Sequence, residues 1–376
     1  MTIIYLYRSL AAFGGVERIF IDKANYLAEH YGYHVYIITW EQGGHSIVYP
    51  LSPKVTHIDW GILFYRQYQY GLFKRMFMQW KMEKEFFKKL SNFVHTTQAD
   101  IVIGASCEFT TMAGMDLLQR KTHTILETHS MRTSIEKNNP PAGNLLMRWA
   151  FKRRDKQLHQ YIKHMSAFVT LTHNDAKDWS DITPQARIIP NMLHRYPAEI
   201  SPDKKTQKRI ITAGRLVEQK GYDLLLDAWS KVHQKHPEWI LDIYGEGEDK
   251  NMLLEKRKNL ALENSVLFHP PTPDIYQKYM DSDFYVMSSR YEGFGLVLAE
   301  AMSCGIPCVS FDCPHGPSDI IKDHEDGLLV EKENIKELAD KICYLIENEN
   351  VRIKMGHKAR ENVKRFLPEN VMPQWK

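Results

Sequence analysis

The sequence predicts an α/β protein with two domains. Short hydrophobic segments recur along the chain, and most are followed by a longer segment with helical periodicity. The chain has 376 residues, which is long for a single hydrophobic core. Residues 284–307 show the repeating unit most clearly, because an apolar run leads into a glycine turn and then into a helix that ends at Gly305 and Pro307.

Each strand is expected where a hydrophobic run is bounded by turn residues. In the first domain these runs are 2–6, 34–39, 55–59, 100–104, 124–130, 167–172 and 186–190, and in the second they are 209–214, 239–245, 266–271, 284–288 and 307–312. We expect a first domain at 1–196, a polar and proline-containing linker at 197–208, a second domain at 209–355 and a C-terminal helical segment at 356–376.

Composition favours a cytoplasmic globular protein. Hydrophobic residues make up 43% and charged residues 25%, and no apolar run reaches the length of a membrane span. The first eight residues resemble a strand rather than a signal peptide, and five cysteines fit a reducing compartment. The net charge is only +3, but residues 1–200 hold 24 Lys and Arg against 17 Asp and Glu. This surplus indicates that the first domain meets an anionic partner.

The segment around residue 292 combines an anion site with two carboxylates. A strand, a glycine turn and a helix present a helix N-terminus, which suits a phosphate. Glu292 precedes this helix and Glu300 lies about one and a half turns into it. Neither carboxylate suits a phosphate, so we expect both to accept hydrogen bonds from sugar or ribose hydroxyl groups.

Five motifs in this order resemble the retaining glycosyltransferases of family four. They are Gly14-Gly15-Val16-Glu17, Ile189-Pro190-Asn191, Ala213-Gly214-Arg215 with Lys220-Gly221, Glu292 and Glu300 around Gly293-Phe294-Gly295, and Asp312 to Asp319. The resemblance implies the GT-B fold, in which two Rossmann-like, doubly wound parallel-sheet domains face each other across a cleft. It also implies that the C-terminal helix at 356–376 crosses back to the N-terminal domain.

The resemblance assigns roles in sugar transfer to named residues. Arg215 and Lys220 would hold the donor diphosphate together with the turn and helix start at Gly293, Phe294, Gly295 and Leu296. Glu300 would bind the ribose, and Glu292 would orient the donor sugar.

In the first domain, Gly14 and Gly15 would approach the diphosphate and the acceptor, and His129 would lie near the donor sugar. The ordinary alternatives are a plain strand-to-helix turn at Gly14 and a structural histidine at position 129.

The expected reaction moves a hexosyl or N-acetylhexosaminyl unit with retention, without a metal and without a cofactor other than the donor. Residues 312–319 resemble a bacterial subset that often uses UDP-linked sugars, so UDP is the expected nucleotide. The expected acceptor is a glycan or a polyprenyl-diphosphate-linked intermediate of surface polysaccharide synthesis. Met192 and the Pro270-Pro271 pair depart from the family pattern, which leaves the contact to the base open.

Two alternatives stay open for the function. One is a non-catalytic protein that binds sugar nucleotides, and the other is a different GT-B enzyme, such as a phosphorylase or a nucleotide-sugar epimerase. For Cys304, Cys308, Cys313 and His315, buried small side chains are expected in place of a metal site, because the spacing lacks close ligand pairs.

Residues 65–90 interleave aromatic side chains with seven basic and only two acidic residues, and residues 145–154 form a second stretch of this kind. Such patterns are typical of helices that lie on anionic membranes, and the alternative is a packed helix with a solvated face. Nucleic acid is not expected as a partner, because no binding motif accompanies the charges. The inner face of the cell membrane is therefore a hypothesis for the location.

Overall fold

The computed structural model describes residues 1–105, 107–118, 122–130, 132, 145–198 and 206–376. Contacts divide the chain into unit 1, Met1–Ile189, and unit 2, Pro190–Lys376. Most of the expected linker at 197–208 lies outside the described residues, as do several side chains of the stretch at 145–154. The domain limits and the crossing of the C-terminal segment stay predictions.

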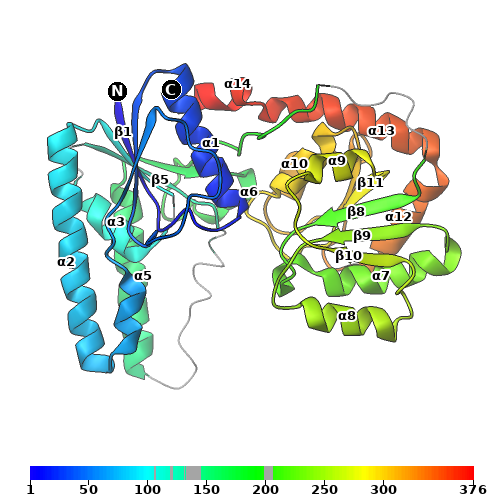
Figure 1. Ribbon diagram of the computed structural model, residues 1–376, viewed down its shortest axis with the longest axis horizontal. Helices are drawn as coiled ribbons and strands as arrows, with labels where there is room; N and C mark the ends of the chain where they lie inside the picture. Colours follow the sequence, from blue (N-terminus) through cyan, green and yellow to red (C-terminus); the bar gives the residue numbers. More distant parts are fainter. Residues whose placement is uncertain (106, 119–121, 131, 133–144, 199–205) are drawn as a thin grey trace. The chain divides into compact units, whose positions relative to one another are not determined.

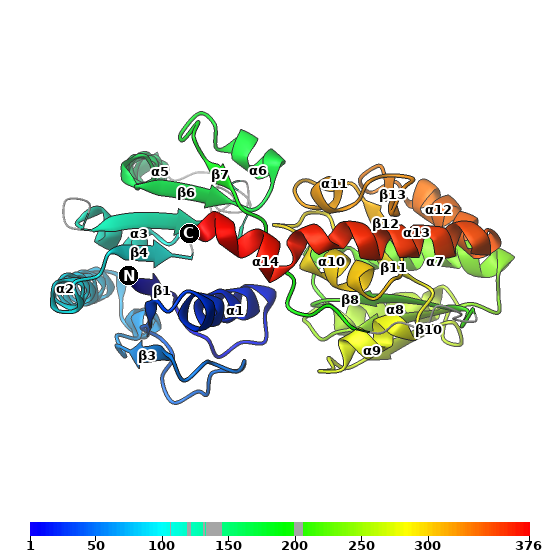
Figure 2. The same ribbon diagram turned by 90° about the horizontal axis from the view of Figure 1, so that it is seen from above.

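Unit 1 contains a parallel sheet of seven strands in the order β3-β2-β1-β4-β5-β6-β7. The strands are β1 (Thr2–Leu6), β2 (His34–Thr39), β3 (Val55–Asp59), β4 (Ile101–Gly104), β5 (His123–Glu127), β6 (Ala167–Thr170) and β7 (Arg187–Ile188). Helices cover both faces (Figure 2), which explains why the central strands β1 and β4 are hydrophobic along almost their whole length, whereas the edge strands β3 and β7 are more polar.

The helices of unit 1 divide between the two faces of its sheet. They are α1 (Gly15–His30), η1 (Phe64–Gln69), α2 (Leu72–Thr97), α3 (Phe109–Asp116), α5 (Leu145–His164) and α6 (His173–Asp178). Figure 2 shows α1 on one face and α2, α3 and α5 on the other. Phe86 and Leu90 of α2 and Met112 of α3 are fully buried in one core with Val102 and Leu126 of the strands.

Unit 2 contains a second parallel sheet, with six strands in the order β10-β9-β8-β11-β12-β13. The strands are β8 (Arg209–Ala213), β9 (Ile240–Tyr244), β10 (Val266–His269), β11 (Phe284–Met287), β12 (Cys308–Phe311) and β13 (Gly327–Val330). The expected strands are confirmed to within a few residues, but β13 was not expected. It pairs with β12 at the edge of the sheet, and its sequence, Gly-Leu-Leu-Val between Asp326 and Glu331, is a short apolar run that was overlooked.

The helices of unit 2 pack on both sides of this sheet (Figure 1). They are η2 (Glu218–Lys220), α7 (Tyr222–Lys235), α8 (Lys250–Asn259), α9 (Ile275–Met280), α10 (Leu296–Ser303), α11 (Pro317–Ile320), α12 (Ile335–Glu347), α13 (Glu349–Asn362), η3 (Val363–Phe366), α14 (Pro368–Val371) and η4 (Met372–Trp375). Trp229 of α7 and Ile243, Val286 and Ile342 are fully buried in one core. None of the helices within the described ranges is both long and apolar enough to cross a bilayer.

Each sheet contains a switch point, where successive strands stop being added on one side of the sheet and start being added on the other. In unit 1 it lies between β1 and β4, and in unit 2 it lies between β8 and β11. Loops that leave the carboxyl ends of such neighbouring strands diverge to opposite faces and leave room for a ligand. The Gly14 loop follows β1, the Arg215 loop follows β8, and the Glu292 loop follows β11. The topology therefore places the predicted motifs where ligands of open α/β sheets bind.

Asp175 gives unit 1 a testable dependence on pH. It lies in α6 with only 4% exposure, and one carboxylate oxygen has no hydrogen-bond partner among the described residues. Burial, with a smaller contribution from Asp178, raises the pKa of Asp175 to about 7. The folded state therefore prefers the protonated carboxyl, and stability decreases as pH rises from about 4 to about 7.

We predict that Asp175→Asn removes this loss. Urea unfolding at pH 5 and pH 8 should show that the variant gains stability relative to the natural protein at the higher pH, by on the order of a few kcal/mol. The same pH dependence in both proteins would contradict a neutral buried carboxyl group.

Candidate active site

A lysine and a glutamate meet at the switch point of unit 2. Lys220 Nζ donates to Glu292 Oε1 over 2.7 Å, and Ser289 Oγ donates to the same oxygen over 2.5 Å. The side chains of Lys220 and Glu292 are 17% and 7% exposed. The structure thus brings together two predicted site residues that lie 72 positions apart, and it adds Ser289, which sequence reasoning missed.

The pair depends on a close approach of the two loops that carry it. Gly221 adopts a left-handed conformation, with φ of 61°, and a Cβ atom there would lie 2.1 Å from the carbonyl oxygen of Ser288. Ser288 Oγ in turn donates to the carbonyl oxygen of Lys220 over 2.9 Å. Only glycine allows this conformation and this contact together, so the Lys220-Gly221 motif holds the lysine against the Glu292 loop.

The start of α10 offers backbone amides beside this pair in the sequence. Gly295 is its N-cap residue with φ of 87°, and no side chain caps the helix. Phe294 is buried and packs edge-on against Phe366, with ring centroids 5.4 Å apart. Its carbonyl oxygen lies so close to Gly316 that a Cβ atom there would be 2.0 Å away. The turn is therefore held from both sides, and the uncapped helix start suits an anion.

Arg215 and Glu300 are placed differently from the pair. Arg215 is exposed, and among the described residues none forms a hydrogen bond or ion pair with its guanidinium group. The Arg215 loop is anchored by Leu216, whose amide donates to the carbonyl oxygen of Glu246 over 2.9 Å. Glu300 is half-buried on α10, after Leu296 and Val297 have opened the helix. An exposed guanidinium on a fixed loop is able to bind phosphate oxygens as a fork.

The glycine loop of unit 1 is more closed than expected. Glu17 turns back over Gly14, where a Cβ atom would lie 2.1 Å from its carboxylate oxygen. Tyr7 donates its hydroxyl to the other oxygen of Glu17 over 3.0 Å. Gly15 has no atom within 4 Å of the Cβ position. The Gly14 amide itself donates to the carbonyl oxygen of Ala12 over 3.1 Å, so a ligand that binds this amide must compete with that bond.

His129 belongs to a buried ionic cluster that includes two residues not predicted from sequence. His129 Nε2 lies 3.2 Å from Glu127 Oε2, and Lys23 of α1 forms an ion pair with the same oxygen. The side chains of all three are at most 4% exposed. Burial alone would raise the pKa of Glu127, but Lys23 and His129 outweigh it and leave that pKa below its usual value. An ionised carboxylate only accepts, so Nε2 of His129 must carry the proton.

This cluster leaves the other ring nitrogen for a ligand. Nδ1 of His129 is buried and has no hydrogen-bond partner within the described part of the chain. In a neutral ring with its proton on Nε2, Nδ1 is able to accept a hydrogen bond from a hydroxyl group. The sequence offered two signals for this cluster, because both residues interrupt an apolar pattern. Glu127 stands at the end of a hydrophobic strand, and Lys23 stands on the buried side of an amphipathic helix.

We predict that Glu127→Gln destabilises unit 1 by about 3 kcal/mol, because Lys23 becomes an unpaired buried cation. The double variant Lys23→Met with Glu127→Gln should recover most of this loss, as measured by urea unfolding. Nitrogen NMR of the His129 ring should show the Nε2–H tautomer in the natural protein and a mixed population in both variants. An unchanged tautomer in the variants would contradict the orienting role of Glu127.

The structure also resolves the question of the cysteines. Cys304, Cys308, Cys313 and Cys343 are free and buried, and burial raises the pKa of each thiol. Cys304 Sγ and Cys308 Sγ face backbone carbonyl oxygens at 3.7 and 3.8 Å. This agrees with the expectation of buried small side chains.

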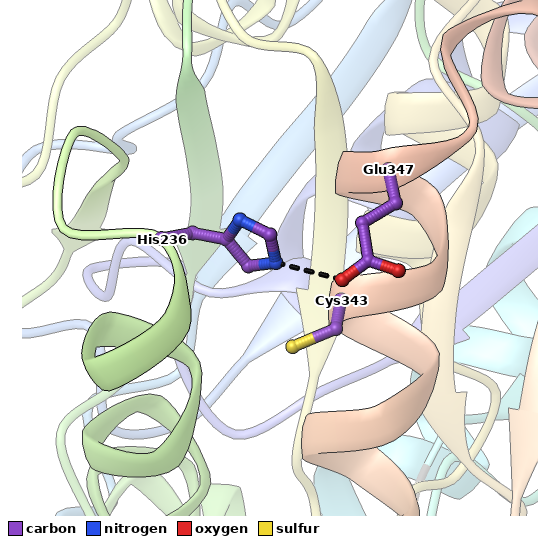
Figure 3. A group of neighbouring side chains, drawn as sticks. All are labelled: His236, Cys343 and Glu347. Carbon is purple, nitrogen blue, oxygen red and sulfur yellow. Dashed lines mark hydrogen bonds and ion pairs between the residues drawn. The ribbon is translucent and has the colours of Figure 1, made fainter.

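A different trio, His236, Cys343 and Glu347, holds its ligand atoms within 4.8 Å of one another. Figure 3 shows the imidazole of His236 facing the carboxylate of Glu347, and these atoms lie 2.9 Å apart. Glu347 is half in solvent, and the Cys343 thiol has a raised pKa because it is buried. A closed zinc site needs a fourth ligand and a thiolate. The trio is explained as an ion pair that joins the ends of α7 and α12.

Comparisons with known proteins find similarity to glycosyltransferases. Residues 198–362 match the family described as glycosyl transferases group 1, and this range contains every candidate residue of unit 2. The chain is 29% identical to an uncharacterized glycosyltransferase of Haemophilus influenzae over 99% of its own length and 98% of the relative's. It is 37% identical to the amylovoran biosynthesis glycosyltransferase AmsD of Erwinia amylovora over 49% of this chain and 51% of AmsD.

The fold is that of GT-B glycosyltransferases. A structure of Staphylococcus aureus TarM, in complex with alpha-GlcNAc-glycerol and UDP, superposes with a TM-score of 0.76. The match covers 100% of this chain and 98% of TarM at 17% sequence identity. Together, the family match, the relatives and the fold support a glycosyltransferase.

Proposed function

We propose that this glycosyltransferase moves a hexosyl or N-acetylhexosaminyl unit from a UDP-linked donor to a glycan or polyprenyl-diphosphate-linked acceptor, with retention of configuration. The observation that carries the proposal is the Lys220–Glu292 pair at the switch point of unit 2, within the segment that matches the family. A cation for the diphosphate and a carboxylate for sugar hydroxyls meet there at 2.7 Å. The reaction would serve the synthesis of a surface polysaccharide; the name of AmsD assigns that relative to amylovoran biosynthesis.

The diphosphate is the part of the donor that unit 2 is best suited to bind. Arg215, Lys220 and the amides at the start of α10 would neutralise the charge that grows on the leaving group. In this proposal these groups meet the charge without a bound metal. The preference for UDP is supported by the UDP present in the TarM structure.

The carboxylates would bind the hydroxyl groups of the donor. Glu292 would hold the donor sugar so that its anomeric carbon faces the acceptor, and Glu300 would accept from the ribose. For unit 1 we propose that His129 and the loop at Gly14 and Gly15 contact the sugar or the acceptor. The transfer would take place in the cytoplasm, at the inner face of the cell membrane.

The pairing in the ligand-free structure gives the proposal a specific consequence. Lys220 is occupied by Glu292, so binding of a diphosphate must share or break this ion pair. Removal of the Glu292 charge should free Lys220 for the phosphates. Replacement of Glu292 by a neutral residue should therefore raise or preserve the affinity for the nucleotide and lower the rate of sugar transfer.

The test is calorimetric titration of the full chain with UDP, GDP and ADP, with and without magnesium, followed by turnover of UDP-sugars. We expect selective binding of UDP without magnesium. Arg215→Ala should weaken UDP binding by about 10- to 100-fold, as expected for lost charge-assisted hydrogen bonds. Glu292→Gln should bind UDP at least as well as the natural protein while its transfer rate falls by about 100-fold or more.

Lys354→Ala serves as the control, because Lys354 is an exposed cation on α13. It should change neither quantity. Binding of UDP without turnover of any UDP-sugar would favour the non-catalytic alternative, and loss of UDP affinity in Glu292→Gln would contradict the role of the ion pair. NMR analysis of the anomeric configuration of the product decides whether configuration is retained.

A further inference from the structure

Large apolar side chains are concentrated on one small part of the surface of unit 1. Thirteen large hydrophobic residues are exposed among those described, and seven of them lie between residues 65 and 80. They are Tyr65, Tyr68, Leu72, Phe73, Met76, Phe77 and Trp80, with exposures from 48% to 87%. A cluster of this kind marks a binding surface, whereas single exposed apolar residues are ordinary. We call these seven residues the α2 tip.

The α2 tip exists because only half of α2 packs against the domain. The buried residues of this helix are Met82, Phe86, Leu90 and Val94, so burial begins only after its first ten residues. The first three turns bury none, and in Figure 1 they extend below the sheet of unit 1, where η1 contacts them. Leu72, Phe73, Met76, Phe77 and Trp80 fall within an arc of about 140° on a helix of 3.6 residues per turn. They therefore form one continuous apolar face.

Cations border this face. Residues 64–84 contain Arg66, Lys74, Arg75, Lys81 and Lys84 but a single acidic residue, Glu83. Arg75 lies over the ring of Tyr68 at 4.2 Å, and Lys84 lies over that of Trp80 at 3.9 Å. The aromatic rings thus lie between the apolar face and the charges, as in helices that bind at the boundary of headgroups and acyl chains.

The positive charge around the α2 tip, combined with its apolar face, favours an anionic membrane over the other possible partners. A second copy of this chain, paired through the same face, would bring two sets of cations together, which opposes association. Nucleic acid would meet the charges but would leave Leu72, Phe73 and Met76 without apolar partners. A bilayer with anionic lipids satisfies both features, because its headgroups attract the cations and its acyl region accepts the apolar side chains.

We propose that the α2 tip is a docking surface for anionic membranes, with Leu72, Phe73, Met76, Phe77 and Trp80 inserted below the headgroups and the neighbouring lysines and arginines on them. The inference rests on the proposed function only in its choice of location, since the evidence is the surface of unit 1 alone. Docking would hold the enzyme at a surface where a lipid-linked acceptor is concentrated.

The test is flotation of the full chain with vesicles of phosphatidylcholine alone and with vesicles that also contain phosphatidylglycerol. The natural protein should float with the anionic vesicles only. The double variant Phe73→Ser with Phe77→Ser should lower the membrane-bound fraction about tenfold or more, and Lys74→Gln with Arg75→Gln should lower it at low salt and have less effect at high salt. All four residues lie outside the described core, so folding should be unaffected.

The matched control is Met252→Ser with Ile353→Ser, which removes two exposed apolar side chains from unit 2. It should bind vesicles like the natural protein. UDP titration of every variant separates this inference from the proposed function, because the tip variants should keep their affinity for UDP. Full flotation of the apolar variant, or no flotation of the natural protein, would overturn the proposal. Self-association in solution that the same substitutions abolish would instead assign the surface to a second copy.

Discussion

Three loops of unit 2 approach one another so closely that no side chain fits between them. Gly221 lies against the carbonyl oxygen of Ser288, and Gly316 lies against that of Phe294, with room for a hydrogen atom and not for a Cβ atom. The first contact joins the loops after β8 and β11, and the second joins the loop after β11 to the loop after β12, all at the carboxyl edge of the sheet. The Lys220–Glu292 ion pair and the uncapped start of α10 both depend on this approach. The chemistry proposed for the donor therefore rests on backbone geometry that glycine alone permits.

Both units hold a lysine and a glutamate at or beside the switch point of the sheet, but in different environments. In unit 2, Lys220 is partly accessible and is able to exchange its carboxylate partner for a phosphate. In unit 1, Lys23 and Glu127 are sealed from solvent, and the carboxylate also receives His129. Breaking a sealed pair leaves a buried charge, so the cluster fixes the orientation of His129 more rigidly than a surface contact would. The pair in unit 2 suits the exchange of a carboxylate for a ligand, and the cluster in unit 1 suits the positioning of His129.

The excess of Lys and Arg over Asp and Glu in the first 200 residues is partly concentrated at one place in the structure. Part of it surrounds the α2 tip, on a helix whose first turns have no fully buried side chain. A helix that served only the fold could end where its packing ends. The additional turns carry aromatic and basic side chains together, which gives unit 1 a surface unlike the rest of the described chain.

The sequence by itself determined the class of the protein, most of its strands and the motifs of its site. Hydrophobic runs report burial directly, and glycine turns such as Gly293 to Gly295 report backbone conformations that other residues disfavour, so both are local signals. The edge strand β13 carried a run of only three apolar residues, Leu328 to Val330, and this short signal was overlooked.

Only the tertiary structure decided which of these residues meet. Lys220 and Glu292 are 72 positions apart, and Lys23 and Glu127 are 104 apart, so their contacts depend on strand order and on the close approach of loops. The same holds for α2, because its amphipathic pattern continues along the helix while only its second half finds a sheet to pack against. Periodicity states which face of a helix is apolar, but the neighbouring elements determine whether that face is buried.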